Sequence, residues 1–488
     1  MQQNRLFVLR CSLVAALGGL LFGFDTAVIS GTTEALQTLY HLSDGWLGFT
    51  VASALIGTIV GSISVGRPTD RIGRRNMLMC MGVLYFVSAV GSALAWDWYS
   101  FLIFRFIGGL GVGGASVLSP MYIAEISPAG QRGRLVALAQ FNIVLGILLA
   151  FLSNYVISLF SLGATEWRWM FGVEAVPAAA FFVLLFSNPY SPRWLMSKGR
   201  REEAQTILRR LEANPETVET ELRAIRESLD LEHHAINEPF CSRKYLKPIL
   251  LACVIGAFNQ LSGINAVLYY APKLFKMTGA AGESAMLQSV IIGLVNLVFT
   301  MAALAVIDRI GRKKLMLAGS VGYILSLGVV ALTFLAYNTE FTNAIGAMQA
   351  VVDAQNAGSE AQVITGLRAV EALALAQVKT GGIIILAGLI VFIASHAFGQ
   401  GAVIWVFISE IFPNRVRARG QALGSFTLWI FCALISQTFP VVVGRFGGAT
   451  IFGIYCLCMV LQLIWVLVYM PETKGVPLED IQKQMGIE

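Results

Sequence analysis

Long apolar runs separated by short polar stretches dominate this chain. A membrane-spanning helix needs about 20 mostly apolar residues to cross a hydrocarbon core about 30 Å thick. Twelve runs of about this length occur, six on each side of a long polar centre. They cover residues 6–29, 46–65, 77–95, 99–121, 135–157, 169–187, 248–271, 286–307, 315–336, 381–407, 421–443 and 448–469. The pattern predicts an all-α membrane protein with twelve transmembrane helices.

Two motifs recur in the second half of the chain. Residues 70–75 (DRIGRR) return as 308–313 (DRIGRK), and 122–126 (YIAEI) return as 407–411 (FISEI). Such a repeat predicts a tandem duplication, with two pseudo-symmetric six-helix bundles. We predict an N-terminal bundle over 1–190, a cytoplasmic linker over 191–247, a C-terminal bundle over 248–470 and a cytoplasmic tail over 471–488.

The two polar segments have different patterns. The linker carries Leu208, Leu211 and Leu222 at helical spacing among Arg and Glu, which predicts short amphipathic helices on the membrane surface. The two copies of the second motif lie about 47 residues farther apart along the chain than the two copies of the first motif. Residues 338–379 supply this extra length. The spacing of apolar residues in this insert predicts one amphipathic helix outside the membrane, as a surface or lid element.

Basic residues set the orientation. Arginines and lysines gather at one end of the predicted spans, and by the positive-inside rule that end is cytoplasmic. Both termini fall on the same side, so we expect a multi-pass protein of the cell membrane with cytoplasmic termini. The net charge of +6 follows this topology and gives no reason to expect a nucleic-acid partner.

Composition excludes several classes of protein. The chain is 56% hydrophobic and only 13% charged, with a mean hydropathy of +0.70, which argues against a soluble enzyme. Its seven cysteines lie in apolar runs or in the polar centre, without disulfide or zinc spacing. We therefore expect no metal, no cofactor and no catalytic residues.

Asp25, Arg105 and Glu174 lie inside predicted spans at similar depths, away from the basic end. Each lies about 8 to 9 Å below the outer surface, at 1.5 Å of rise per residue. Intramembrane charges are costly and usually functional. Asp25 could alternate between a protonated state and a state paired with Arg105, which is what proton coupling requires. A permanent structural salt bridge explains the same residues equally well.

A second polar set lies near the membrane midplane. Amides offer hydrogen-bond donors and acceptors, and an aromatic face covers the C–H face of a sugar, so the set suits a neutral polyhydroxylated ligand. Any one amide alone would more often join two helices. Glycines at 263, 399 and 401 would permit helix breaks beside a binding cavity. The midplane residues are Gln260, Asn265, Asn296, His396 and Trp429.

The recurring motifs contain acids as well as arginines. Setting the topology explains the arginines but not the acids. We therefore expect ion pairs that close the cytoplasmic mouth, such as Asp70 with Arg74 and Glu125 with Arg134. The corresponding residues of the second repeat are Asp308, Arg312, Glu410 and Arg419.

Taken together, these motifs resemble the sugar porter family of the major facilitator superfamily over nearly the whole chain. The matching segments are 66–75, 105–113, 120–134, 191–195, 260–270 and 409–413. The resemblance implies alternating access and a hexose, pentose or polyol as cargo. Residues 19–31 are similar to the proton-coupled branch of the family, and Asp25, Arg105 and Glu174 match its coupling positions. It also places Phe22, Asn259, Tyr270 and Trp405 in the substrate site.

Several positions depart from the family pattern. Asn259 replaces one of two paired glutamines, and Tyr190 replaces a glutamate. Ile147 and Phe151 occupy the part of helix 5 where relatives carry a sugar-binding glutamine. His396 stands where an aromatic residue is usual, while Ala402 replaces a proline and Leu428 an asparagine. The coupling residues are therefore retained, while the cargo site is altered.

We predict a monosaccharide/proton symporter that works as a monomer in the bilayer. Protonation of Asp25 would release Arg105 and allow the loaded carrier to turn inward. One alternative is a uniporter of the same fold, in which Asp25 and Arg105 stay paired. A second is a transporter-like sugar sensor, although its usual long cytoplasmic tail is missing from the sequence given.

Overall fold

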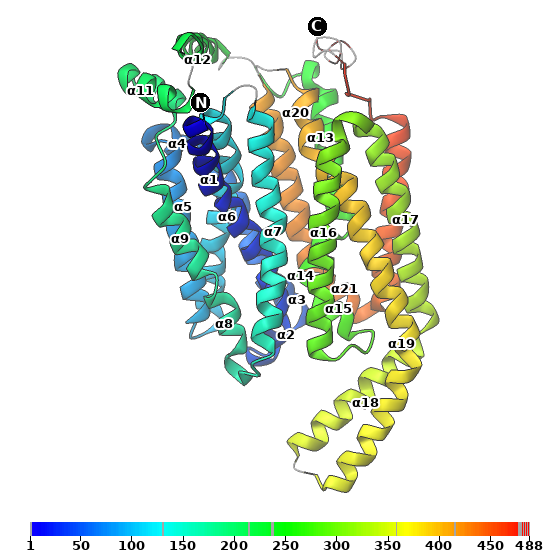
Figure 1. Ribbon diagram of the computed structural model, residues 1–488. Coiled ribbons are helices and arrows are strands. Elements are labelled where there is room, and N and C mark those ends of the chain that lie inside the picture. The colour runs from blue at the N-terminus through cyan, green and yellow to red at the C-terminus, as the bar shows by residue number, and fades with distance from the viewer. Residues whose placement is uncertain are drawn as a thin grey trace.

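The computed structural model describes residues 2–128, 131–212, 215–235, 239–357, 359–413 and 416–476, with four single residues of the C-terminal tail. Within these residues the regular secondary structure is helical and no strand occurs. The predicted all-α class is confirmed, and Figure 1 shows the helices running side by side as one elongated bundle.

The first half contains six membrane spans. The sixth is broken into two shorter helices, and short helices connect the first span to the second and the second to the third. The spans are α1 (Gln2–Val28), α3 (Asp44–Ser64), α5 (Arg74–Ala93), α6 (Trp98–Ile126), α7 (Arg132–Ser158), and α8 (Glu166–Gly172) with α9 (Ala175–Leu185). The connecting helices are η1 (Ile29–Gly31), α2 (Thr33–Leu39) and α4 (Gly66–Ile72).

The second half repeats this plan with more interruptions. Its first span comprises α13 (Leu246–Leu261) and α14 (Ile264–Tyr269), followed by the short α15 (Ala271–Lys276). The remaining helices are α16 (Gly282–Ile310), α17 (Arg312–Ala336), α19 (Ala361–Phe398), α20 (Gln400–Ile411) and α21 (Arg417–Val468).

The number of spans agrees with the prediction. Eleven described segments are long and apolar enough to cross a membrane. The last of them, within α21, contains Gly447, whose backbone is not helical (φ 75°, ψ 174°). This break divides α21 into two helices, so the described chain contains the twelve spans that the apolar runs predicted.

Two of the three predicted glycine breaks are present. Gly263 adopts a left-handed conformation (φ 84°) between α13 and α14, where a side chain would be strained. Gly399 separates α19 from α20 with φ −95° and ψ −97°. Gly401, in contrast, lies within the first turn of α20. The helix 10 region is therefore broken at Gly399 and not at Gly401.

The insert of the second half differs from its prediction. We expected one amphipathic helix over 338–379, but two helices are present. The first is α18 (Asn338–Asn356), and the second is the beginning of α19, which continues unbroken into the membrane span. They lie against each other as a helical hairpin that projects beyond the bundle (Figure 1). The apolar spacing revealed the returning helix but not its partner, because α18 is rich in alanine and uncharged polar residues.

The helices of the linker and the N-terminal end of α1 lie at one end of the bundle (Figure 1). We call this end the linker face, and the end that carries the hairpin the opposite face. The linker contains α10 (Pro192–Ser197), α11 (Arg201–Leu211) and α12 (Pro215–Ala235). Leu208, Leu211 and Leu222 are buried there.

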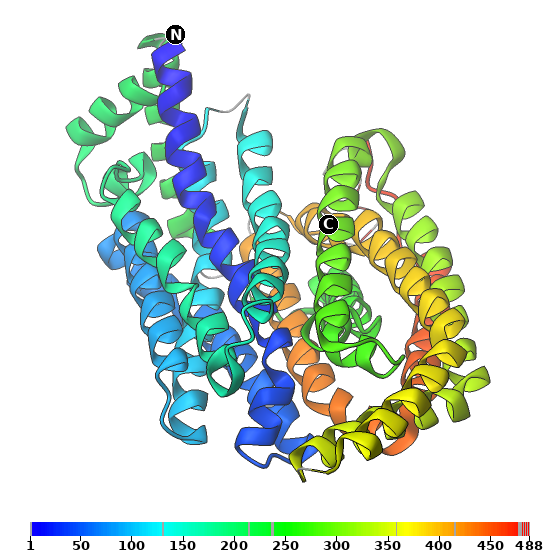
Figure 2. The same cartoon turned by 60° about the horizontal axis from the view of Figure 1, so that its bottom comes forward.

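The two halves form two separate groups of helices when seen from an angle (Figure 2). They contact each other mainly through α7 against α16 and α3 against α21. The candidate site lies between these two contacts.

Candidate functional site

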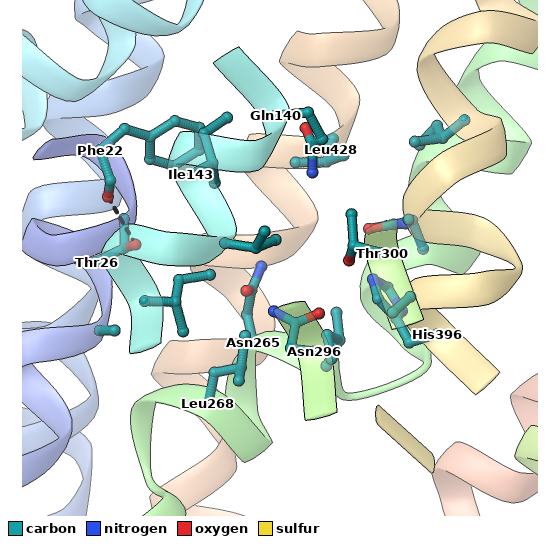
Figure 3. A pocket seen from close by; sticks show the side chains of 18 of the residues that line it. Phe22, Thr26, Gln140, Ile143, Asn265, Leu268, Asn296, Thr300, His396 and Leu428 are labelled. Carbon is teal, nitrogen blue, oxygen red and sulfur yellow. Dashed lines mark hydrogen bonds between the residues drawn. The ribbon is translucent and has the colours of Figure 1, made fainter. Parts of the chain in front are cut away.

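A cavity of about 150 Å³ lies between the two halves, in the middle of the bundle. Its walls are mostly apolar, with a set of uncharged polar side chains on the second-half side (Figure 3). The polar and aromatic residues that line it are Phe22, Thr26, Gln140, Asn259, Gln260, Asn265, Tyr269, Asn296, Thr300, His396, Trp405 and Trp429.

The first-half wall is built by α1 and α7. Phe22 and Thr26 are one turn apart on α1, so they share a face of that helix. The two helices approach closely because α7 has Gly146 where a Cβ would lie 2.0 Å from the Leu20 carbonyl oxygen. In the same way, a Cβ at Gly23 on α1 would lie 1.9 Å from the Ile143 carbonyl oxygen. Paired glycines therefore fix this wall.

The second-half wall contains a relay of three amides. The amide NH₂ group of Asn265 donates to Gln260 Oε1 at 2.8 Å, and that of Gln260 donates to Asn259 Oδ1 at 2.9 Å. Asn265 also donates to Cys432 Sγ at 3.1 Å. The left-handed turn at Gly263 makes this relay possible, because it brings Asn265 of α14 back beside the end of α13. Among the described residues the amide NH₂ group of Asn259 and Asn265 Oδ1 have no hydrogen-bond partner, so the relay offers donors at one end and an acceptor at the other.

Aromatic rings cover two further sides of the cavity. Trp429 of α21 lies 5.6 Å from the ring of Phe22 between centroids, so the pair connects the two halves. Trp405 of α20 is 37% exposed, which leaves its ring face accessible to a ligand. Figure 3 shows Asn296, Thr300 and His396 on the side away from Phe22. Polar groups and aromatic rings arranged in this way suit a ligand that has both hydroxyl groups and a C–H face.

Most of the predicted substrate residues line the cavity. Phe22, Asn259, Gln260, Asn265, Asn296, His396, Trp405 and Trp429 all do. Tyr270 does not: its hydroxyl donates to the Ser436 carbonyl at 2.9 Å, and its ring stacks on Phe439. The adjacent Tyr269 lines the cavity in its place, because consecutive residues of a helix point about 100° apart.

Besides Tyr269, three polar lining residues were missed from the sequence. They are Thr26, Gln140 and Thr300. Gln140 had a signal, since it is an uncharged amide inside an apolar run on α7, two turns before Ile147. Threonines give almost none, because they are common in membrane helices and bond to their own backbone, as Thr26 does to the Phe22 carbonyl at 2.9 Å.

The three predicted coupling residues are brought together beside the cavity, not within it. Arg105 Nη1 donates to Asp25 Oδ1 at 2.7 Å, and Arg105 Nη2 donates to the Asp25 carbonyl at 3.1 Å. Both side chains are almost completely buried. Glu174 is also buried and interacts electrostatically with both. Because Thr26 and Phe22 line the cavity, α1 connects the ligand site directly to the Asp25–Arg105 pair.

Several polar atoms of these three side chains are buried without a partner among the described residues. Asp25 Oδ2, Arg105 Nε and Glu174 Oε1 have no hydrogen-bond partner within the described residues. The guanidinium of Arg105 lies 5.2 Å from the centre of the Phe171 ring. Arg105 is thus ion-paired with Asp25 and lies in the electrostatic field of Glu174, and a polar atom of each of these three side chains is left without a partner in the described part of the chain. A proton added to either carboxylate removes a charge that attracts Arg105.

Ion pairs at the linker face lie within each half. In the first half Arg74 bonds Asp70 at 3.2 Å and Glu125 at 3.1 Å. Glu125 also accepts a short hydrogen bond from Ser191 Oγ, which ties the cluster to the linker. We expected Glu125 to pair with Arg134; instead Arg134 is exposed and Arg74 takes its place. Arg74 is the first residue of α5, and the turn at Gly73 (φ 90°) between α4 and α5 places it beside the end of α6.

The second half repeats this cluster. Arg312 bonds Asp308 at 3.0 Å and Glu410 at 2.9 Å, and Glu410 accepts from Thr473 Oγ1 at 2.6 Å. Arg419 is half-buried nearby at the start of α21. The predicted pairs Asp70–Arg74 and Asp308–Arg312 are therefore present, and each acid of the second motif bonds the arginine of the first.

Polar contacts between the halves occur at the opposite face. Lys276 of α15 pairs with Glu34 of α2, and Lys273 donates to Gln37 Oε1 at 3.2 Å. Gln437 Nε2 of α21 donates to the Gly45 carbonyl at 2.8 Å. These contacts hold α15 and α21 against α2 and α3. The halves are thus joined at the end farther from the linker.

Comparison with known proteins agrees with this architecture. The family model described as "Sugar (and other) transporter" matches residues 11–354 and 358–485. The chain is 37% identical to the D-xylose-proton symporter of Escherichia coli (strain K12), covering 99% of this chain and 96% of the relative. It is 35% identical to the arabinose-proton symporter of Bacillus subtilis (strain 168), covering 98% and 95% respectively.

Solved structures give the same result. The partially occluded, inward-open conformation of the xylose transporter XylE from E. coli matches with a TM-score of 0.79 and 35% identity, covering 96% of this chain and 99% of that one. XylE bound to 6-bromo-6-deoxy-D-glucose matches with a TM-score of 0.76 and 36% identity, covering 99% and 100%. With a family model and relatives above 30% identity covering almost its entire length, the protein is a transporter and not an enzyme, and it belongs to the sugar (and other) transporter family of the major facilitator superfamily.

Proposed function

We propose that this protein carries a monosaccharide and a proton together across the cell membrane by alternating access. The observation that carries the proposal is the position of α1 between the ligand cavity and the Asp25–Arg105 pair. One face of the helix presents Phe22 and Thr26 to the cavity, and another holds the carboxylate that would take the proton.

The cavity supports a small neutral polyol as cargo. Among its described lining residues none is a carboxylate, lysine or arginine, so it favours a neutral ligand over an ion. Its volume is about 150 Å³, below the roughly 300 to 1,000 Å³ of pockets for drug-sized molecules. Amides on one wall and aromatic rings on others suit hydroxyl groups and C–H faces. The relatives named for xylose, arabinose and glucose have cargo of this class.

Proton coupling would act through charge. While Asp25 is ionised, Arg105 binds its carboxylate and its carbonyl, which fixes α1 against α6. A proton on Asp25 removes the negative charge and weakens both the ion pair and its hydrogen bonds. Arg105 can then turn to Glu174, and α1 is free to move with the sugar bound to Phe22 and Thr26. The proton and the sugar thus favour the same conformational change.

The orientation follows from the charges. The arginine clusters lie at the linker face, so the positive-inside rule makes that face, with both termini, cytoplasmic. Ion pairs between the halves then close the outer side in this conformation. We propose that the Arg74 and Arg312 clusters hold each half rigid while the mouth at the linker face opens and closes between them. One chain contains the complete cavity, which supports a functional monomer.

The test uses the purified protein in liposomes with an inward proton gradient and labelled pentoses and hexoses. A symporter accumulates its sugar above equilibrium, and a protonophore abolishes the accumulation. Asp25→Asn should eliminate accumulation yet retain exchange of labelled for unlabelled sugar, because the amide resembles the protonated carboxyl. Loss of exchange as well would assign Asp25 to folding or binding.

A uniporter is the second candidate, because the Asp25–Arg105 pair is as buried as a permanent structural ion pair would be. In that case a proton gradient would give equilibration without accumulation in the unmodified protein. The same liposomes therefore distinguish the two functions.

A further inference from the structure

His396 carries a structural feature that the transport cycle described above does not use. Its ring lines the cavity near Thr300 (Figure 3). The ring nitrogen Nδ1 lies 2.6 Å from the hydroxyl oxygen of Tyr323 on α17. The other ring nitrogen, Nε2, has no hydrogen-bond partner within the described residues, and the side chain that carries it lines the cavity. What His396 offers a ligand therefore depends on which nitrogen carries the proton.

A chain of buried hydrogen bonds extends from Tyr323 away from the cavity. Tyr323 lies 3.0 Å from Gln400 Oε1, the Gln400 amide lies 2.5 Å from the Gln462 amide, and Gln462 lies 2.9 Å from Ser320 Oγ. All of these side chains are fully buried, so water is not available to exchange with them. The chain ends where Ser320 Oγ meets the Met316 carbonyl oxygen at 2.8 Å.

This last contact fixes the direction of every bond before it. A carbonyl oxygen can only accept, so the single hydroxyl proton of Ser320 is donated to Met316. Ser320 Oγ must then accept from Gln462, which requires the NH₂ group of Gln462 to face it. The carbonyl oxygen of the Gln462 amide is left facing Gln400.

The same reasoning continues toward the cavity. Gln400 must present its NH₂ group to Gln462, so its Oε1 faces Tyr323 and can only accept. Tyr323 therefore donates its single proton to Gln400. The Tyr323 oxygen is left as an acceptor for His396, so Nδ1 must carry the ring proton. In a neutral imidazole, Nε2 then has a lone pair and no hydrogen.

We propose that His396 determines substrate specificity by accepting a hydrogen bond through Nε2 from one hydroxyl group of the transported monosaccharide. Tyr323, Gln400, Gln462 and Ser320 act as positioning residues that hold the required tautomer. This inference rests on the proposed function, since it concerns the sugar in the same cavity. It gives His396 the role of an acceptor, in contrast to the amide NH₂ group of Asn259, which can only donate to a ligand.

The tautomer can be tested without any sugar. The full-length protein is labelled with ¹⁵N-histidine in lipid nanodiscs, and the spectrum of His396→Gln identifies the His396 signals among those of four histidines. We expect a protonated Nδ1 and an unprotonated Nε2. A protonated Nε2 would overturn the inference while leaving sugar transport untouched, so the two failures are distinguishable.

The second test measures binding of D-xylose and D-glucose with their monodeoxy and monofluoro analogues. Fluorine accepts a hydrogen bond weakly but cannot donate one. At the hydroxyl that faces His396, both changes should therefore weaken binding about tenfold, as expected for one buried acceptor left without a donor. In His396→Phe, the penalty at this position should fall below about twofold.

Tyr323→Phe provides the control for positioning. It removes the hydroxyl group that holds the Nδ1 proton, so the ring can present Nε2–H instead, and the penalty for fluorine should fall while the penalty for the deoxy analogue remains. Some hydroxyl positions will show a deoxy penalty that falls in His396→Phe. The proposal is wrong if, at every such position, the fluoro analogue binds the unmodified protein as tightly as the parent sugar does. That result would make His396 a donor.

Discussion

Asp25 and Arg105 are 80 residues apart in the sequence and 2.7 Å apart in the structure. The residue that permits this contact is a glycine. A Cβ at Gly108 would lie 2.3 Å from Ser88 Oγ and 3.2 Å from Asp25 Oδ1. The coupling site therefore depends on the absence of a side chain as much as on its three charges.

Gly108→Ala should disturb the pair without changing any charge. The added methyl group must displace Ser88 and crowd Asp25, at a cost of about 1 to 3 kcal/mol for overpacking. We expect proton-driven accumulation to fall by more than half, with a lower Tm of the purified carrier. Gly111→Ala is the matched control on α6, since its nearest contacts would be 3.5 Å away. If accumulation and Tm fall equally in the two variants, Gly108 has no particular role in the coupling site.

At the scale of the element, the break between α13 and α14 decides how the cavity wall is built. Gly263 has φ 84°, and a Cβ there would lie 2.3 Å from the ring of Tyr455 on α21. Without the break, α13 would continue straight and Asn265 would not turn back toward Gln260. The local fold thus forms the amide relay.

Gly263→Ala should therefore impair sugar binding and stability together. A left-handed alanine costs about 1 to 2 kcal/mol, and the contact with Tyr455 adds to this. We expect at least a tenfold weaker affinity for the transported sugar, measured by equilibrium binding. Gly453→Ala, on the same helix as Tyr455 and in open space, should bind normally. If Gly263→Ala binds the sugar with unchanged affinity, the amide relay does not depend on the left-handed turn at Gly263.

For the whole molecule, the question is what holds one side closed. The pair Lys276–Glu34 and the bond from Lys273 to Gln37 join the halves at the opposite face. The clusters around Arg74 and Arg312 each lie within a half. Opening of the opposite face must therefore break cross-half contacts there, while the clusters of the linker face can stay intact.

Glu34→Gln should shift the molecule toward the state open at the opposite face. A partly exposed ion pair contributes only about 0.2 to 1 kcal/mol, so the equilibrium should change about 1.4- to fivefold. Distances between spin labels on α2 and α15 measure this shift. Glu283→Gln is the control, because it removes an equal charge near the same face. Within the described chain Glu283 forms no ion pair between the halves. An equal shift in both variants would point to net charge instead of the pair.

Lys273 gives this closure a pH dependence. Burial lowers the pKa of Lys273 below its usual value of 10.5, although the charges of Asp44 and Glu34 oppose the effect. The closed arrangement therefore binds this proton less tightly than an open one, in which Lys273 is hydrated. Raising the pH from the lowered pKa toward 10.5 should favour closure, and at lower pH the ammonium is charged in both states.

The same spin-label distances test this between neutral pH and about pH 10. Lys273→Met has no proton to lose, so its distance distribution should not change over that range. Opening at high pH in the unmodified protein, or an equal response in the variant, would contradict the assignment to Lys273.

The sequence by itself determined the membrane class, the twelve spans, the duplication and most of the cavity residues. Each of these follows from a local or periodic property: a span must be apolar along its whole length, and a buried amide or charge in such a run is costly enough to mark a site. Asp25, Arg105 and Glu174 were found in this way, as were Gln260, Asn265 and His396. Gly263 was recognised because few other residues permit such a break.

Only the tertiary structure decided which partners meet. Glu125 bonds Arg74 and not Arg134, and Tyr269, not Tyr270, faces the cavity. Gln140 joined the site because α7 turns that side of the helix inward, and α18 folded back on α19 as a hairpin. The direction of the hydrogen bonds behind His396 depends on five residues from three helices. Such facts depend on helix rotation and packing between distant segments, and no local pattern of the chain encodes them.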